Sequence, residues 1–274
     1  MQRIKALNDI IDNYKVIFCD VWGVLHNGEK IFDPAVEALL LARRKGKIVI
    51  CVTNSPRLSK YVQQQLSVMG LDKNCYNKIV TSGDVTRSLI TQYSRKIFHI
   101  GHHKDKVIFD GLDIELVAAE QAESIVCTGL FDDKPYAEDY INLLKYFSSV
   151  NLPFICANPD LIVDYKGQLR LCAGTLAKLY EEMGGATFFA GKPFAPIYDL
   201  AREYAQEILQ AEINNNEILA IGDGLLTDVK GANQQNIDIL YIDSGIHRNL
   251  SNFELRKALE QYNVSFNKFM AYLA

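Results

Sequence analysis

Several features that define common protein classes are missing from this sequence. No apolar run approaches the roughly 18–20 residues of a membrane span, and the N-terminal residues 1–9 lack the apolar core of a signal peptide. Lys and Arg total 29 against 33 for Asp and Glu, and the basic residues are scattered, which gives no support for nucleic-acid binding. We therefore expect a cytoplasmic protein that binds neither membranes nor nucleic acids.

Cysteine is present, but without the spacing of a metal site. The six cysteines include no Cys-x-x-Cys pair, and those at positions 19, 51, 127 and 156 fall within or beside apolar runs. Such cysteines act as small hydrophobic residues in a reducing compartment. Glycine-rich phosphate loops of the Walker or dinucleotide type are also missing. These patterns argue against a zinc site and against the common nucleotide-binding loops.

What the sequence does contain is a regular alternation of short apolar runs and amphipathic segments. Strands are predicted at 15–19, 47–52 and 79–81, and helices at 34–45, 57–69 and 83–94. Asp33-Pro34 is a favourable helix start, because aspartate can cap a helix and proline fits its first turn. Short apolar strands with helices between them are typical of a doubly wound parallel sheet.

The middle third repeats this pattern as a unit of its own. It contains predicted strands at 96–101, 124–127 and 153–156 and predicted helices at 136–147 and 173–183. From residue 187 the first pattern resumes, with a helix at 194–209, a strand at 217–221, a helix at 225–235, a strand at 237–242 and a helical segment at 250–272. The sequence therefore predicts an α/β, Rossmann-like core formed by residues 1–83 and 189–274, with a second α/β domain inserted at 84–188.

Four separated segments place polar or charged residues directly after an apolar run. They are Asp20-Val21-Trp22-Gly23, Thr53-Asn54-Ser55, Gly191-Lys192-Pro193 and the segment from Gly222-Asp223 to Asp228. Because the carboxyl ends of parallel strands converge on one edge of a sheet, we expect these side chains to meet despite separations of up to about 200 residues.

The chemistries of these segments complement one another. Asp20 and Asp223 could hold Mg²⁺ through carboxylate oxygens, and the donors of Thr53-Asn54-Ser55 could bind phosphoryl oxygens. The ammonium of Lys192 would stabilise charge that builds on a transferred phosphoryl group. Asp228 could orient the lysine or a metal-bound water, or it could simply begin a helix.

In this order, the four segments resemble the motifs of the haloacid dehalogenase (HAD) superfamily of phosphohydrolases. The insertion between Thr53 and Lys192, with Thr81-Ser82-Gly83-Asp84 and Ala157-Asn158-Pro159-Asp160, is similar to that of class IIA. That class includes phosphatases of N-acetylglucosamine phosphate, 4-nitrophenyl phosphate and pyridoxal phosphate. The resemblance covers about residues 14–245 and implies a HAD core that carries a class IIA cap domain.

The resemblance also implies roles for individual residues. Asp20 would be the nucleophile and a metal ligand, Trp22 would bind the metal through its backbone carbonyl, and Asp223 would bind it through its carboxylate. Thr53, Asn54 and Lys192 would hold phosphate, and Asp228 would support the site from outside the ligand set. The implied cofactor is Mg²⁺ and the implied partner is a small phosphorylated metabolite. A homodimer is also compatible, since members of the class often pair through their caps.

Trp22 departs from the family pattern. Phosphatases of the family have a second aspartate here, which protonates the leaving alcohol and then activates water. An indole has one N–H donor and no titratable group in range, so it can do neither. General acid–base catalysis contributes about 10²–10⁴-fold, so we expect slow or substrate-restricted turnover with phosphate binding retained. Trp22 would otherwise be a packing residue of the site or a surface on which the substrate stacks.

Alternatives remain open at this point. The chain could be a catalytically impaired homologue that binds a phosphorylated ligand as a sensor or scaffold. Carbon–halogen hydrolysis is disfavoured, because the cap of the dehalogenases lies between the first two motifs, where only about 30 residues separate Asp20 from Thr53. His26 is the nearest replacement acid, although a loop histidine is usually solvated. Asn158 and Asp160 either contact the substrate or form a Pro-containing turn.

Overall fold

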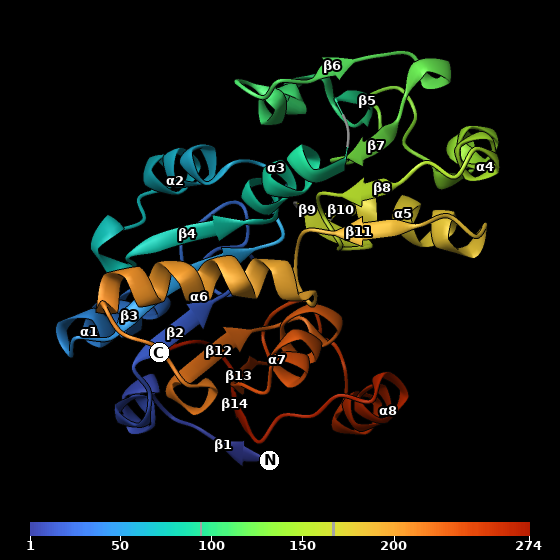
Figure 1. Ribbon diagram of the computed structural model, residues 1–274. Helices are drawn as coiled ribbons and strands as arrows, with labels where there is room; N and C mark the ends of the chain where they lie inside the picture. Colours follow the sequence, from blue (N-terminus) through green and yellow to red (C-terminus); the bar gives the residue numbers. More distant parts are fainter. Residues whose placement is uncertain (94, 166–167) are drawn as a thin grey trace. The chain divides into compact units, whose positions relative to one another are not determined.

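The protein is described by a computed structural model that covers residues 1–93, 95–165 and 168–274. Its helices and strands form two compact units, each with a parallel sheet of its own (Figure 1). The first unit comprises Met1–Thr53, Gln63–Val80 and Lys192–Ala274, and the second comprises Asn54–Val62 and Thr81–Gly191. The second unit contains the range 84–188 predicted for the inserted domain and also includes residues 54–62, 81–83 and 189–191.

The first unit is built on a seven-stranded sheet with the strand order β1-β14-β13-β12-β2-β3-β4. Its strands are β1 (Gln2–Arg3), β2 (Val16–Cys19), β3 (Ile48–Thr53), β4 (Lys78–Thr81), β12 (Ile218–Gly222), β13 (Asp238–Ile242) and β14 (Lys268–Met270). The described pairings are parallel. Every residue of β2, β3 and β12 is buried, which explains their uninterrupted apolar sequences, since both faces of a parallel sheet are covered.

The helices of the first unit follow the predicted pattern closely. They are α1 (Asp33–Arg44), α6 (Ala195–Leu209), the π-helical turn η8 (Leu225–Val229), α7 (Lys230–Gln235) and α8 (Asn252–Tyr262), with α2 (Ser59–Val68) crossing the boundary of the two units. Short 3₁₀ turns occur at η1 (Leu7–Asp9), η2 (Ile11–Asn13), η3 (Lys73–Cys75) and η7 (Asn215–Glu217). The helix predicted at 225–235 therefore begins as a π turn, and the one at 34–45 begins at Asp33, directly before proline.

The helical segment predicted at 250–272 is confirmed over α8 and is wrong beyond it. Helix α8 ends at Tyr262 because Asn263 adopts the left-handed conformation with φ 51°, which closes a helix. The chain then forms β14, which pairs with both β13 and β1. Phe266 stacks on Tyr241 of β13, with ring centroids 4.5 Å apart, and this packing favours the strand over further helix.

The second unit has a five-stranded sheet with the order β11-β8-β7-β5-β6, and all its pairings are parallel. The strands are β5 (Lys96–Ile100), β6 (Glu115–Leu116), β7 (Ser124–Cys127), β8 (Phe154–Cys156) and β11 (Thr187–Phe189), and β9 (Ile162–Tyr165) pairs with β10 (Gln168–Leu171) as a separate antiparallel ladder. The helices are α3 (Ser82–Tyr93), α4 (Ile141–Ser149) and α5 (Ala173–Glu182), with 3₁₀ turns η4 (His103–Phe109), η5 (Ala119–Gln121) and η6 (Ala137–Tyr140).

Two apolar clusters cover the opposite faces of this second sheet. Ile125 and Cys127 of β7 pack in one cluster with residues of α4 and α5, whereas Val126 packs in the other with Ile90 of α3. Successive side chains of a strand point to opposite faces, so one short strand contributes to both cores. The predicted fold class, a doubly wound parallel sheet with an inserted α/β domain, is confirmed.

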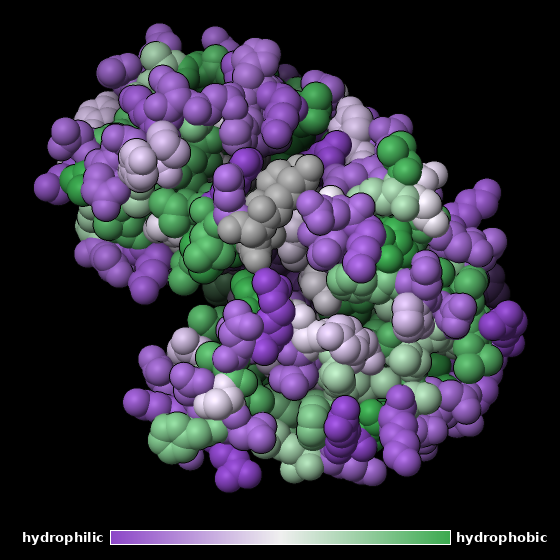
Figure 2. Space-filling model, turned by 180° about the vertical axis from the view of Figure 1, so that it is seen from behind, coloured by the Kyte–Doolittle hydropathy of each residue, from purple (hydrophilic) through white to green (hydrophobic). Residues whose placement is uncertain are grey.

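Apolar residues are concentrated in these cores, and the cysteines are buried with them. All six cysteines have free thiols and are buried. Hydrophilic residues predominate on the face in Figure 2, and the hydrophobic ones on it are dispersed among them. Within the described parts of the chain, no helix has the length and apolar character needed to cross a membrane.

Candidate active site

Asp20 and Asp223 follow neighbouring strands at the point where the sheet changes its winding direction. Strand β2 pairs with β3 on one side and with β12 on the other, so the connections diverge between β2 and β12. The backbone N–H of Asp20 donates to the carbonyl of Ile221 on β12 at 2.8 Å, which fixes the two strand ends against each other. Open α/β sheets bind ligands at such a switch point.

Lys192 joins two of the predicted carboxylates. Its Nζ donates to Oδ1 of Asp20 at 2.6 Å and to Oδ1 of Asp228 at 2.8 Å. The three side chains are only 4–8% exposed, so the ion pairs are shielded from solvent. The second oxygen of Asp228 accepts from the backbone N–H of Gly224 at 3.1 Å, which orients the carboxylate toward the lysine. Asp228 is therefore more than a helix-start residue.

Asp223 sits in a recess formed by backbone. Its Oδ2 accepts from the N–H of Ile246 at 2.7 Å. A Cβ atom at Gly23 would lie 2.3 Å from Oδ2, and one at Gly245 would lie 1.9 Å from it, so both positions require glycine. Gly23 belongs to the first predicted segment, but nothing in the sequence indicated that Gly245, after β13, would contact Asp223.

Burial disfavours the ionised forms of two carboxylates in this cluster, Asp20 and Asp223. Burial raises the pKa of Asp223 to about 7, and the negative charge of Asp228 adds to the effect. Burial also raises the pKa of Asp20 well above its usual value, against the opposing charge of Lys192. Burial alone would lower the pKa of Lys192, but the charges of Asp20 and Asp228 raise it well above its usual value, so the lysine stays protonated.

The geometry of the three carboxylates fits a divalent cation. Asp20, Asp223 and Asp228 are buried, and each offers an oxygen within 4.8 Å of those of the other two. When all three are ionised, their charge exceeds the single positive charge of Lys192, which leaves an excess of buried negative charge. Hard cations such as Mg²⁺ prefer carboxylate oxygens and would neutralise that excess.

The indole of Trp22 packs against two residues of its own loop, His26 and Gly28. Its ring lies edge-on to that of His26, with centroids 5.0 Å apart and planes at 74°. A Cβ atom at Gly28, where φ is +88°, would lie 2.5 Å from the indole, so the absence of a side chain lets the backbone pack against the ring. Packing within its own loop is therefore one function of Trp22, and contact with a substrate stays a prediction.

His26 is not the solvated loop histidine that the sequence suggested. It is only 3% exposed, and its Nδ1 accepts from the N–H of Gly28 at 2.9 Å. Burial lowers the pKa of His26 to about 4, so the ring is neutral at pH 7. A neutral imidazole whose Nδ1 is engaged cannot serve as an imidazolium acid, which argues against His26 as the replacement for the missing aspartate.

The other four predicted site residues are divided between the two units. Thr53 is buried at the end of β3, in the first unit. Asn54, Asn158 and Asp160 belong to the second unit, where Nδ2 of Asn54 donates to Oδ1 of Asp160 at 2.9 Å. Asp160 in turn donates its backbone N–H to Oδ1 of Asn158 at 3.1 Å. Each unit thus contains one hydrogen-bonded group of three predicted residues, Asp20, Lys192 and Asp228 in the first and Asn54, Asn158 and Asp160 in the second.

Tyr198 is a neighbour of the cluster that the sequence did not single out. It lies on α6, is 2% exposed, and has its pKa raised by burial and by the charge of Asp228. A Cβ atom at Gly231 would lie 2.1 Å from its hydroxyl oxygen, so α7 approaches this ring closely. From helical periodicity alone Tyr198 is a core residue, and only the position of Asp228 reveals that it borders charged groups.

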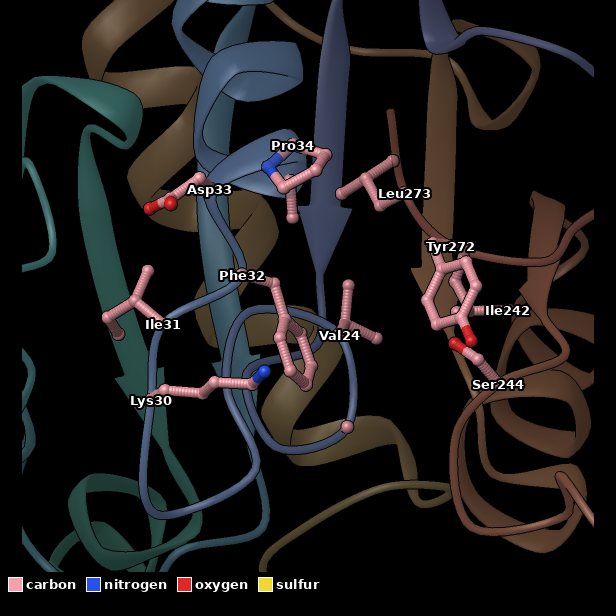
Figure 3. Close-up of a pocket in the computed structure, with 12 residues that line it drawn as sticks. Val24, Lys30, Ile31, Phe32, Asp33, Pro34, Ile242, Ser244, Tyr272 and Leu273 are labelled. Carbon is pink, nitrogen blue, oxygen red and sulfur yellow. The ribbon is translucent and has the colours of Figure 1, made fainter.

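A separate cavity of about 260 Å³ opens in the first unit (Figure 3). Its walls come from residues 30–35, which include the start of α1, and from segments at or after the ends of β2, β13 and β14. The lining residues are Gly23, Val24, Lys30, Ile31, Phe32, Asp33, Pro34, Ala35, Ile242, Ser244, Tyr272 and Leu273. None of the predicted catalytic residues belongs to this lining, although Gly23 separates the cavity from Asp223.

Comparison with known proteins relates these features to one family. The family profile described as haloacid dehalogenase-like hydrolase matches residues 17–115, and one described as HAD-hydrolase-like matches residues 189–264. A crystal structure of a haloacid dehalogenase-like hydrolase from Brucella suis is 46% identical, covers 99% of this chain and 100% of its own, and superposes with a TM-score of 0.90.

Curated relatives are more distant. The ribonucleotide monophosphatase NagD of Escherichia coli is 22% identical over 236 residues, which are 85% of this chain and 88% of NagD. The 4-nitrophenylphosphatase of Schizosaccharomyces pombe is 20% identical over 258 residues, with 85% of this chain and 84% of the relative covered. These relatives are phosphatases of the class that the sequence motifs indicated. The chain belongs to the haloacid dehalogenase-like hydrolase family, in its class IIA, and is an enzyme of the hydrolase class.

Proposed function

We propose that the protein is a Mg²⁺-dependent hydrolase of phosphate monoesters that acts on a small phosphorylated metabolite through an aspartyl-phosphate. The observation that carries this proposal is the buried network in which Lys192 bridges Asp20 and Asp228 beside Asp223. Phosphoryl transfer to an aspartate requires a carboxylate nucleophile, a positively charged side chain and oxygens that can hold a metal ion.

The chemistry proceeds in two steps. A carboxylate oxygen of Asp20 attacks phosphorus, the bond between phosphorus and the ester oxygen breaks, and the leaving group departs with the bonding electrons. Water then attacks the phosphorus of the aspartyl-phosphate, which releases inorganic phosphate and restores Asp20. Lys192 is hydrogen-bonded to Asp20 at 2.6 Å, and in this proposal its charge stabilises the equatorial oxygens as they gain negative charge.

Magnesium would be held by the carboxylates of Asp20 and Asp223 and by the backbone carbonyl of Trp22. When bound, the cation supplies electrostatic stabilisation of the phosphoryl group and offsets the repulsion between two anions. Asp228 holds Lys192 in place through its 2.8 Å hydrogen bond. Thr53 and Asn54, at the end of β3, bind the phosphoryl oxygens.

The second unit serves as the cap that selects the substrate. This role rests on the family relationship, as does a homodimer formed through the caps. Asn158 and Asp160, in the loop after β8, are its candidate contacts to the substrate. A cytoplasmic location fits a metabolite as substrate and six free thiols.

Trp22 sets the limits of this activity. Without an aspartate at this position, a leaving group must depart with little help from protonation, so esters with acidic alcohols are the favoured substrates. Water attack in the second step also lacks a base. The indole, held by His26 and Gly28, presents an apolar surface on which an aromatic leaving group can stack.

The test is hydrolysis of 4-nitrophenyl phosphate with Mg²⁺ by the wild type, Asp20→Asn and Trp22→Asp. The proposal predicts activity in the wild type, loss in Asp20→Asn and faster turnover in Trp22→Asp. An Asp20→Asn variant as active as the wild type would show that Asp20 is not the nucleophile.

A second candidate function rests on Trp22 itself. An impaired homologue would bind a phosphorylated ligand as a sensor or scaffold, with phosphate and metal sites retained and turnover absent. Its signature in the same assay is an inactive wild type, with activity gained in Trp22→Asp.

A further inference from the structure

We infer that Asp160 is a positioning residue, which fixes the Asn54 side chain and thereby the turn after β3 that binds phosphate. The inference rests on the proposed function, because it concerns how the phosphate donors of Thr53 and Asn54 are held. It assigns Asp160 a role different from direct contact with the substrate.

The central observation is the hydrogen bond from Nδ2 of Asn54 to Oδ1 of Asp160, at 2.9 Å. The two residues are 106 positions apart in sequence, yet both belong to the second unit. Asn54 is 5% exposed and Asp160 is half-buried, so the donor side of this bond lies away from water. Because a carboxylate only accepts, the amide must present its NH₂ group to Asp160, and the orientation of the Asn54 side chain is thereby determined.

The opposite side of the Asn54 amide is equally constrained. A Cβ atom at Gly191 would lie 2.5 Å from Oδ1 of Asn54 and 2.9 Å from Oγ of Ser82. Any side chain at position 191 would therefore displace the amide. The amide is therefore constrained from two sides, by the hydrogen bond to Asp160 and by the close approach of the Gly191 backbone.

Asp160 is itself fixed by its own loop. Its backbone N–H donates to Oδ1 of Asn158 at 3.1 Å, which forms a local turn. A Cβ atom at Gly174, in the first turn of α5, would lie 2.5 Å from the Asp160 carbonyl oxygen. The next residue, Leu161, accepts from Oγ1 of Thr175 at 2.6 Å. The start of α5 thus anchors the segment that presents the carboxylate.

These contacts connect the loop after β8 to the phosphate-binding turn. Asn54 directly follows Thr53, so a fixed Asn54 side chain also orients the peptide that joins these two residues. Asp160 then acts on phosphate through Asn54, and its loss should weaken phosphate binding more than it slows the chemical step. A residue that only stabilises its loop would not alter phosphate affinity in this selective way.

The test compares inorganic phosphate binding, by calorimetry with Mg²⁺ and by competitive inhibition, in four variants. Asp160→Ala removes the acceptor, Asp160→Asn keeps an oxygen acceptor, Asn54→Ala removes the donor, and the fourth variant combines Asn54→Ala with Asp160→Ala. A lost hydrogen bond to a charged group predicts about 10-fold weaker phosphate binding in Asp160→Ala. Asp160→Asn should stay near the wild type, and the double variant should be no weaker than the weaker single variant.

The matched control is Asp113→Ala, which removes an aspartate of the same unit whose side chain is 80% exposed and paired with Arg95. It should bind phosphate as the wild type does. Unchanged affinity in Asp160→Ala, equal weakening in Asp160→Asn, or losses that multiply in the double variant would each overturn the inference. A wild type that binds no phosphate would instead refute the proposed function together with this role.

Discussion

Polar residues follow the strands of both parallel sheets, but the two groups differ in how their members are paired. At the carboxyl edge of the first sheet, buried carboxylates meet one ammonium, and burial raises the pKa of Asp20 and Asp223. The second unit has a Thr128–His99 pair at 2.9 Å after its strand β7 and the Asn54–Asp160 bond after β8. Burial lowers the pKa of His99 to about 4, so this histidine is neutral at pH 7.

The difference shows that one architecture supports two tasks. Desolvated charges that repel one another are unfavourable in the free protein and become favourable when a cation and a phosphoryl group are bound. Hydrogen-bonded groups that satisfy one another give a fixed shape and little reactivity. Chemistry is therefore expected at the first edge, and positioning at the second.

The largest expected effect comes from removing the nucleophile. Asp20→Asn should reduce the hydrolysis of 4-nitrophenyl phosphate by about 10³-fold or more, because no aspartyl-phosphate can form. Asp199→Asn, an exposed aspartate on α6, is the matched control and should retain wild-type activity. Similar rates for the two variants would show that Asp20 is not the nucleophile.

Loss of the ammonium should be nearly as severe. Lys192→Met leaves Asp20 and Asp228 buried without their partner, so we expect about 10²–10³-fold slower turnover. The variant should also unfold at lower denaturant concentration, since breaking a buried ion pair costs about 3–5 kcal/mol. Urea unfolding and initial rates measure both effects, and a fully active Lys192→Met variant would contradict the account.

Trp22→Asp should act in the opposite direction. Restoring a carboxyl group at this position is expected to raise turnover by about 10–100-fold for esters with poor leaving groups, and by less for 4-nitrophenyl phosphate. Turnover rates measured across a series of leaving groups test this expectation. The control is Trp22→Asn, because asparagine has the size of aspartate but cannot act as an acid or a base. An equal gain in both variants would mean that the indole acts only by its bulk.

The pH dependence should differ with and without metal. Since the pKa of Asp223 is raised to about 7 in the folded, metal-free protein, folding takes up a proton. The resulting stability is complete below the pKa of the unfolded chain, near 4, and is lost as pH rises through about 7. Asp223→Asn should flatten this decline, and calorimetry near pH 6 should detect protons released by Mg²⁺ binding. Proton uptake on Mg²⁺ binding would contradict the assignment.

The smallest effect concerns packing beside the site. Gly28→Ala places a methyl group 2.5 Å from the indole at a position where φ is +88°, so a loss of about 1–3 kcal/mol in stability is expected. Thermal unfolding measures it. In a Trp22→Ala background the penalty should shrink to the backbone strain alone, and an undiminished penalty would mean that Gly28 and Trp22 do not constrain each other.

Much of this arrangement was predictable from the sequence, because it depends on local pattern. Buried parallel strands appear as uninterrupted apolar runs, and the polar residues after them were expected to converge, as Asp20, Lys192 and Asp228 do. The sequence did not indicate Gly245 beside Asp223 or the bond between Asn54 and Asp160. Those contacts depend on how distant loops fold back, and no periodicity records them.

The helical prediction at 250–272 failed for a related reason. Beyond Tyr262 a left-handed Asn263 closes the helix, and Phe266 stacks on Tyr241 of the sheet. Tertiary packing of aromatic rings outweighs local propensity at a chain segment that joins a sheet.

The most direct test of the central claim is to trap the intermediate. Because the loop after β2 has a tryptophan at position 22, where the family has the aspartate that activates water, the aspartyl-phosphate should accumulate with 4-nitrophenyl phosphate. Acid quenching, borohydride reduction and peptide mass spectrometry should then find homoserine at position 20, alongside a burst of nitrophenolate that approaches one equivalent of enzyme. Steady turnover without a burst and without modification at position 20 would contradict the account.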